Sequence, residues 1–158
     1  MKMKRASIIL ILMVFTAVAA LAKEPSKGEN NKKAEPIELN DIEFVKRVHD
    51  FKRNPNKFIY VGDKPAIIDF YATWCGPCKQ LAPTLKALAA EYGDDIYIYK
   101  VDVDKEPDIA RAYGIRSVPS LLFIPQSDEI PKMGQGVIPK ADLRKEIDEF
   151  LLGKSVSE

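Results

Sequence analysis

The two cysteines of the chain are the residues whose type and spacing point most clearly to chemistry. Cys75 and Cys78 are separated by Gly76 and Pro77 and follow Trp74. At the start of a helix, residues three apart have Cβ atoms about 5–6 Å apart, and a disulfide needs roughly 3.5–4.5 Å, so a small adjustment allows the bond. Proline is favoured in a first helical turn, where unpaired N–H groups and the helix dipole stabilise an anion. A lowered thiol pKa is therefore expected at Cys75, which favours a dithiol that cycles with its disulfide.

The pair has three alternative interpretations. A purely structural disulfide would close a very small loop and would constrain the unfolded chain little. A zinc site would need two more ligands, and His49 is the only histidine of the chain. Two buried, inert thiols would have to share the core with Trp74, Gly76 and Pro77, which suit neither a core strand nor a core helix. The pattern favours redox chemistry over these alternatives.

Hydrophobic periodicity predicts the elements that position the cysteines. The segment 66–71 is apolar on both faces, which is typical of a central strand covered on both sides. A helix over 75–92 follows it and carries the cysteines at its start. Further helices are predicted over 41–51, 108–113 and 141–152, and further strands over 58–61, 96–103, 121–124 and 130–134. With the last two strands paired as a hairpin, this order predicts an α/β fold with a central mixed β-sheet flanked by helices on both faces.

The N-terminal segment 1–22 has the pattern of a secretory signal peptide. A basic start, Met1–Arg5, precedes an apolar run that ends in the small-x-small cleavage site Ala20-Leu21-Ala22. An uncleaved membrane anchor is the alternative, but the apolar run is shorter than the roughly 20 residues of a spanning helix. We therefore expect cleavage after Ala22 and export of the rest of the chain.

The rest of the chain is expected to divide into three parts. Residues 23–36 contain no hydrophobic side chain larger than alanine, so we expect a disordered linker. Residues 37–152 are the predicted folded domain. Residues 153–158 are a polar tail that carries no retention signal for the endoplasmic reticulum.

Charge and composition exclude several classes of partner. The 158 residues carry 24 basic and 23 acidic side chains, so no strong positive field is available for nucleic acid. No metal site and no cofactor is expected besides the redox-active disulfide between Cys75 and Cys78. No feature of the sequence indicates an oligomer, so we expect a monomer.

Three segments resemble the thioredoxin family. Residues 69–79 (DFYATWCGPCK) are similar to its active-site segment, residues 100–104 (KVDVD) to its next strand, and residues 113–123 (YGIRSVPSLLF) to its cis-proline segment. Gly136 is similar to a late glycine of the family. The resemblance extends over nearly all of residues 37–152. Within the family, the chain most resembles exported, periplasmic-type thioredoxins. The resemblance implies the thioredoxin fold and thiol–disulfide oxidoreductase activity.

The resemblance also implies roles for four residues. Cys75 is expected to be the exposed attacking thiol and Cys78 the more buried, resolving one. Burial disfavours a Cys78 thiolate, so a base is needed. Asp69 is the candidate general base, because a carboxylate in an apolar strand is costly unless it is used; the alternative is a strand-end carboxylate in water. Lys100 matches the lysine that pairs with this carboxylate, or else is a solvated charge.

A substrate-binding patch is implied beside the cysteines. By resemblance, the peptide bond before Pro119 is cis and turns the Val118 backbone toward the sulfurs, where an extended substrate would pair with it by strand addition. The flat apolar patch would comprise Trp74, Gly76, Pro77, Val118, Pro119 and Gly136. The alternative for Val118 is a simple core position.

The direction of the reaction stays open at this point. Gly76-Pro77 resembles the reducing members of the family, whereas Val118 resembles the exported disulfide oxidases as well. NADPH is not available outside the membrane, so a reductase needs a membrane electron donor and an oxidase needs a membrane acceptor. We therefore consider an exported protein-disulfide reductase, an exported oxidase or isomerase that assists disulfide formation, and a binding module with a structural disulfide. The expected location is the periplasm, with secretion as an alternative, and the expected partners are disulfide-containing exported proteins.

Overall fold

The computed structural model describes residues 34–155 of the chain. The predicted signal peptide, residues 1–22, and most of the predicted linker lie outside the described residues. Within the described part, none of the helices combines the length and the hydropathy needed to cross a membrane.

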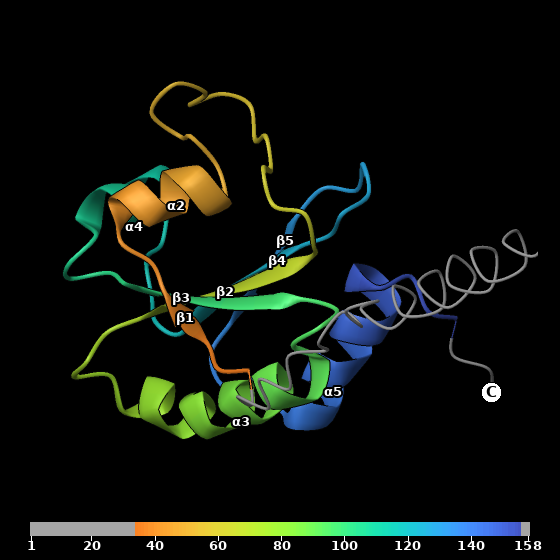
Figure 1. Ribbon diagram of the computed structural model, residues 1–158. Helices are drawn as coiled ribbons and strands as arrows, with labels where there is room; N and C mark the ends of the chain where they lie inside the picture. Colours follow the sequence, from red (N-terminus) through yellow and green to blue (C-terminus); the bar gives the residue numbers. More distant parts are fainter. Residues whose placement is uncertain (1–33, 156–158) are drawn as a thin grey trace, which may run out of the picture. The chain divides into compact units, whose positions relative to one another are not determined.

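A five-stranded mixed sheet forms the centre of the domain (Figure 1). Its strands are β1 (Ile37–Glu38), β2 (Ala66–Tyr71), β3 (Tyr97–Asp102), β4 (Ser120–Ile124) and β5 (Lys132–Gln135). They lie in the order β1-β3-β2-β4-β5. β1, β3 and β2 are parallel, whereas β4 runs antiparallel to β2 and forms an antiparallel hairpin with β5. The predicted mixed sheet and its terminal hairpin are confirmed.

Helices cover both faces of this sheet. They are α2 (Asp41–Arg47), α3 (Gly76–Tyr92), α4 (Pro107–Ala112), α5 (Lys140–Lys145) and the π-helical turn η1 (Glu146–Leu151). In Figure 1, α2 and α4 lie on one side of the sheet, and α3 and α5 lie on the other. This arrangement is the predicted fold class, a thioredoxin-type α/β fold.

The central strand β2 supplies side chains to both layers. Ile67 packs in the core cluster with α3 and the C-terminal helices, whereas Ala66, Ile68 and Phe70 pack in the cluster on the α2 and α4 side. Alternate residues of a strand point to opposite faces, so Asp69 shares the face of Ile67. A carboxylate is thereby placed on the α3 side of this central strand.

The predicted helix over 41–51 is too long. α2 ends at Arg47, and Val48 adopts a non-helical conformation with φ −121°. Val48 and Phe51 are nevertheless buried against Phe44 and its neighbours. Their helical spacing therefore reflects packing of the turn that follows the helix, which periodicity alone does not distinguish from the helix itself.

The predicted strand over 58–61 is wrong. Phe58 and Tyr60 pack against the core on the α2 side, while Ile59 and Val61 are exposed, so the segment alternates as a strand would. Its Val61 N–H, however, donates to the Val48 carbonyl rather than to the sheet. Conversely, β1 was not predicted, because its two residues are too few to show a pattern.

The other predicted elements are displaced by one or two residues. β5 begins at Lys132 instead of residue 130, and Ile130 is exposed in the preceding loop. The helix predicted over 141–152 is α5 followed by η1. The helix was predicted from Leu143, Ile147, Phe150 and Leu151; Leu143, Ile147 and Leu151 are buried, whereas Phe150 is only partly buried.

Candidate active site

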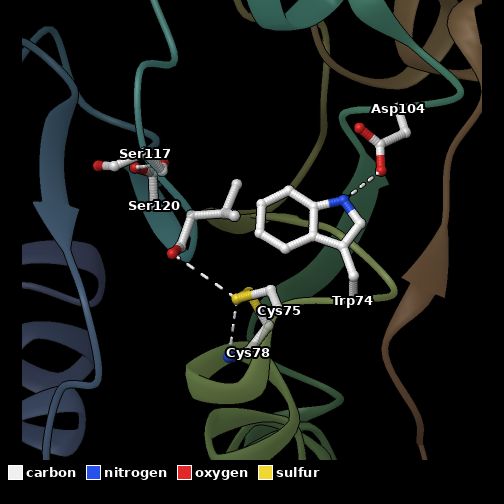
Figure 2. The surroundings of a disulfide bond; sticks show 7 residues. Trp74, Cys75, Cys78, Asp104, Ser117 and Ser120 are labelled. Atoms are coloured by element: carbon white, nitrogen blue, oxygen red, sulfur yellow. Dashed lines mark hydrogen bonds between the residues drawn. A yellow bond between two sulfur atoms is a disulfide. The ribbon is translucent and has the colours of Figure 1, made fainter.

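The cysteine pair lies at the start of α3, directly after β2 (Figure 2). Cys75 is the N-cap residue, and Gly76 and Pro77 form the first turn. The two cysteines are joined by a disulfide, with their Cα atoms 5.3 Å apart. The Cys78 N–H donates a hydrogen bond to the Cys75 sulfur over 3.1 Å. One of the unpaired N–H groups of the helix terminus is therefore aimed at the sulfur that was expected to react.

The expectation that Cys75 is exposed is wrong for this oxidised state. Cys75 is 3% exposed and Cys78 4%, so the two are equally buried. They form a small cluster with Ala72, against which Val103 and Val118 pack. In this oxidised state the disulfide is therefore shielded from solvent.

The cis-proline segment lies beside the disulfide. The Val118–Pro119 peptide bond is cis, as the resemblance implied. The Val118 carbonyl oxygen lies 3.6 Å from the Cys75 sulfur. Gly136, at the end of β5, donates its N–H to the Pro119 carbonyl over 2.8 Å and has a φ of +79°. These contacts bring three segments that are distant in sequence to the same end of the sheet.

The members of the predicted patch differ in exposure. Trp74 is 69% exposed, and Gly76 and Pro77 are also exposed. Val118 is half-buried, whereas Pro119 is buried and contributes backbone rather than surface. The surface around the disulfide therefore presents an indole and a short glycine–proline turn beside the Val118 backbone.

Asp104 fixes the exposed tryptophan and was missed by sequence reasoning. Its Oδ2 accepts the Trp74 indole N–H over 2.8 Å (Figure 2). The available signal was the acidic Asp102-Val103-Asp104 end of a strand parallel to β2, since such ends meet at one edge of a sheet. The hydrogen bond orients an otherwise exposed ring next to the disulfide.

Asp69 is buried on the side of the sheet that faces α3. It is 1% exposed, and its Oδ1 has no hydrogen-bond partner among the described residues. Burial raises the pKa of Asp69 from 3.8 to about 7, while Lys100 opposes the rise and Glu38 adds to it. A pocket of about 190 Å³ adjoins the carboxylate and is also lined by Ala82. Ala82 lies one helical turn after Cys78 on α3, so the pocket beside the carboxylate borders the turn of α3 that follows the cysteines.

The expected ion pair between Lys100 and Asp69 is absent among the described residues. Lys100 is in register with Asp69 across β2 and β3, but its ammonium lies 3.6 Å from Glu38 Oε2. It also lies 4.0 Å from the centroid of the Tyr71 ring. A carboxylate on the unpredicted strand β1 competes for the lysine, so Lys100 acts on Asp69 through its field rather than through contact.

His49 does not join the cysteines. It is buried, with Nδ1 2.9 Å from the Tyr113 hydroxyl and Nε2 3.1 Å from the Lys57 carbonyl oxygen. Across residues 34–155, no group of three or more histidine, cysteine or acidic side chains is arranged to hold a metal ion. The cysteines bind each other, and both ring nitrogens of the histidine have other partners.

Comparison with known proteins agrees with this geometry. The thioredoxin family model matches residues 44–149. The chain belongs to the thioredoxin family.

Individual relatives match most of the same region. A thioredoxin of Borreliella burgdorferi is 46% identical over 114 residues, which are 72% of this chain and 96% of the relative. A chloroplastic M-type thioredoxin of Spinacia oleracea is 40% identical over 110 residues, 69% of this chain and 60% of the relative. The crystal structure of chloroplastic thioredoxin z superposes with a TM-score of 0.57 at 26% identity, covering 72% of this chain and 91% of that one.

Membership of the thioredoxin family settles the class of chemistry. The protein is a thiol–disulfide oxidoreductase, a protein-disulfide reductase that acts on disulfide-containing proteins. The Cys75–Cys78 disulfide is its redox-active pair. The enzymatic interpretation of the pair is confirmed over that of a binding module with a structural disulfide.

Proposed function

We propose that this thioredoxin is exported and reduces disulfides in proteins outside the cytoplasm, with Cys75 as the attacking thiol and Cys78 as the resolving one. The observation that carries the assignment of roles is the hydrogen bond from the Cys78 N–H to the Cys75 sulfur at the start of α3. The same N–H and the helix dipole stabilise a Cys75 thiolate in the reduced protein.

The proposed reaction is two successive exchanges. The Cys75 thiolate attacks one sulfur of the substrate disulfide, a mixed disulfide forms, and the other substrate sulfur leaves as a thiolate that takes up a proton. The Cys78 thiolate then attacks the Cys75 sulfur, which restores the disulfide seen in the structure and releases the second substrate thiol. Two electrons and two protons pass to the substrate, and a dithiol donor must return them.

Asp69 is the proposed acceptor of the Cys78 proton. A general base works best when its pKa is near the operating pH, and burial raises the pKa of Asp69 to about 7. The free Oδ1 and the adjoining pocket leave room for a water between the carboxylate and solvent. In this proposal Lys100 tunes the carboxylate from the neighbouring strand.

The substrate is proposed to dock as an extended segment over the disulfide. Its backbone would pair with Val118, next to the Cys75 sulfur. Trp74, Gly76, Pro77 and Gly136 would supply the surrounding surface. Since this surface offers an indole, a glycine–proline turn and the Val118 backbone but no charged side chain of its own, it would select for an accessible disulfide more than for a particular sequence.

Export is supported by the sequence of residues 1–22, with its basic start and Ala20-Leu21-Ala22 site. A periplasmic location follows, and a membrane protein would have to supply electrons because NADPH is absent there. Gly76-Pro77 supports the reducing direction. Val118 before the cis-proline and the oxidising surroundings outside the cytoplasm favour net oxidation or isomerisation in the cell, in which case electrons would pass to a membrane acceptor.

The redox state of the pair in living cells distinguishes these directions. Cells are quenched with acid, free thiols are alkylated with a mass-shifting reagent, and the periplasmic fraction is analysed by immunoblot. We expect the dithiol form to predominate. A Cys75→Ser/Cys78→Ser variant, which has no thiol to alkylate, shows where the unlabelled protein runs on the gel. A pair that is mainly disulfide at steady state would support the oxidase, and a protein found only in the cytoplasm would contradict export.

A further inference from the structure

Three charged residues lie side by side on adjacent strands. Glu38 of β1 is in register with Lys100 of β3, and Lys100 is in register with Asp69 of β2. Partners in register on parallel strands project from the same face of the sheet. The row across the sheet is therefore carboxylate, ammonium, carboxylate, and the central lysine has two candidate anionic partners.

Glu38 engages the lysine directly. Its Oε2 lies 3.6 Å from the Lys100 ammonium, and its Oε1 accepts a hydrogen bond from the Tyr71 hydroxyl over 2.7 Å. The ammonium also lies 4.0 Å from the Tyr71 ring centroid, so both the ring and the Glu38 carboxylate hold the ammonium in place. Asp69 Oδ1, in contrast, is buried and makes no hydrogen bond within the described part of the chain.

We propose that Glu38 is a positioning residue for the thiol–disulfide reaction: it holds the Lys100 ammonium on the β1 side and thereby leaves the Asp69 carboxylate available as a proton acceptor. The inference rests on the proposed role of Asp69 in deprotonating Cys78. Glu38 itself touches neither the cysteines nor the substrate, and it acts through Lys100.

The other charges that face Asp69 do not substitute for Glu38. Lys86 of α3 and Glu35, which precedes β1, line the same pocket but form an exposed ion pair of 2.8 Å. Neither of them is among the causes of the raised pKa of Asp69. Burial is the main cause of the raised pKa of Asp69; the charge of Lys100 lowers this pKa and the charge of Glu38 raises it. These directions agree with a lysine that is held by Glu38 and does not contact Asp69.

The test is a carboxyl NMR titration of Asp69 in the oxidised protein, where Cys75 and Cys78 do not titrate. Glu38→Gln removes the charge but keeps the size and an oxygen that can accept from Tyr71. Released from Glu38, the Lys100 ammonium can approach Asp69 and favour its ionised form, so we expect the midpoint to fall by about 0.5–1 pH unit. An unchanged midpoint would overturn the proposal.

Two matched variants separate position from net charge. Glu43→Gln removes one carboxylate from α2, on the opposite side of the sheet, where Glu43 pairs with Arg47; it should leave the midpoint unchanged. Glu38→Asp keeps the charge on β1 and should bring the midpoint back toward that of the wild type. A fall as large in Glu43→Gln as in Glu38→Gln would mean that net charge alone is responsible.

The dependence on Lys100 is measured in a double-mutant cycle. Lys100→Gln should raise the Asp69 midpoint, and adding Glu38→Gln should then move it by less than in the wild type. Equal shifts in the two backgrounds would contradict a role through Lys100. If Glu38→Gln does not fold, the Asp69 midpoint is measured in Lys100→Gln and Glu38→Asp instead. The proposal requires the midpoint to rise in Lys100→Gln, and a midpoint that does not rise contradicts it.

Failure of the inference is distinguishable from failure of the proposed function. The rate at which Cys78 resolves a mixed disulfide is followed against pH in wild type, Glu38→Gln and Asp69→Asn. We expect the profile of Glu38→Gln to move to lower pH and that of Asp69→Asn to lose its carboxylate-dependent limb. If only Asp69→Asn changes the profile, the role of Glu38 is wrong and that of Asp69 stands. If Asp69→Asn leaves it intact, the role of Asp69 in the reaction is wrong.

Discussion

At the scale of single residues, the N–H of Cys78 and the sulfur of Cys75 define an asymmetry in a pair that is otherwise equally buried. Only Cys75 lies outside the helix with an N–H of the first turn directed at its sulfur. A thiolate at Cys75 has the Cys78 N–H as a hydrogen-bond donor and lies at the positive end of the helix dipole, whereas Cys78 lies two residues farther into α3 than the first helical residue. The proposed roles of the two cysteines rest on this difference rather than on their exposure.

Single substitutions of the cysteines should therefore have different effects. We expect Cys75→Ser to abolish reduction of insulin disulfides and Cys78→Ser to accumulate mixed disulfides, because the first removes the attacking sulfur and the second the resolving one. Alkylation rates in the two variants report the thiolates directly. Faster alkylation of Cys78 in Cys75→Ser than of Cys75 in Cys78→Ser would reverse the assignment.

Asp69→Asn should remove a pH dependence of stability. Burial raises the pKa of Asp69 in the folded state from 3.8 to about 7, so between about pH 4 and pH 7 the folded state binds a proton that the unfolded state has lost. Stability must then fall as the pH rises through this window and level off above it. Urea unfolding from pH 4 to pH 8 should show this decline in the wild type and not in the Asn variant.

The same variant should be more stable than the wild type at pH 8. The amide also has to be desolvated, so we expect a gain of about 1–3 kcal/mol rather than the full electrostatic cost. Resolution by Cys78 should be slower by on the order of 10² if the carboxylate is the general base. Equal stability at pH 8 would mean that the carboxylate is solvated in solution.

At the scale of elements, the loop of Gly136 and the cis-proline segment depend on each other. The Gly136 N–H bonds the Pro119 carbonyl, and its φ of +79° is disfavoured for residues with a Cβ. A Cβ at this position would meet no atom within 4 Å. A substitution there is therefore opposed by backbone conformation alone.

We expect Gly136→Ala to lower the free energy of unfolding by about 1–2 kcal/mol, measured by denaturant titration of the oxidised protein. Gly76→Ala is the matched control, because a Cβ there also meets nothing within 4 Å and its φ is not positive. It should leave stability unchanged or slightly higher. Equal losses in both variants would indicate a cause other than the φ of Gly136.

The elements also show what the sequence can and cannot predict. The segment 66–71 was recognisable because both faces are apolar, and Asp69 stood out against it. β1 was not recognisable, because Ile37–Glu38 is held by pairing with β3 rather than by a pattern of its own. The resemblance to the family paired Lys100 with Asp69, and Glu38, which enters the site only through that unrecognised strand, was missed.

At the scale of the whole molecule, the described domain fits the chemistry, and the proposal for where the chemistry takes place depends on the sequence that precedes it. The sheet brings β2, β3 and the cis-proline segment to one end, which resemblance to the family predicted. The export proposal rests on the composition of residues 1–22.

Export predicts a defined N-terminus. When the full chain is expressed in a bacterial host, we expect the protein of the periplasmic fraction to begin at Lys23, because cleavage follows Ala22. Intact-mass spectrometry of that fraction identifies the N-terminal residue. A species that still begins at Met1 and sediments with the membranes would identify an anchor instead of a cleaved signal.

Covalent trapping tests the central claim most directly. A Cys78→Ala variant of the full chain is expressed, free thiols are blocked with acid and alkylating reagent, and its complexes are separated by non-reducing electrophoresis and identified by mass spectrometry. We predict mixed disulfides between Cys75 and exported proteins that contain disulfides, and none with Cys75→Ala/Cys78→Ala. If Cys78→Ala traps no partner while Cys75→Ala does, or if every trapped partner is cytoplasmic, then Cys75 is not the thiol that attacks disulfides of exported proteins.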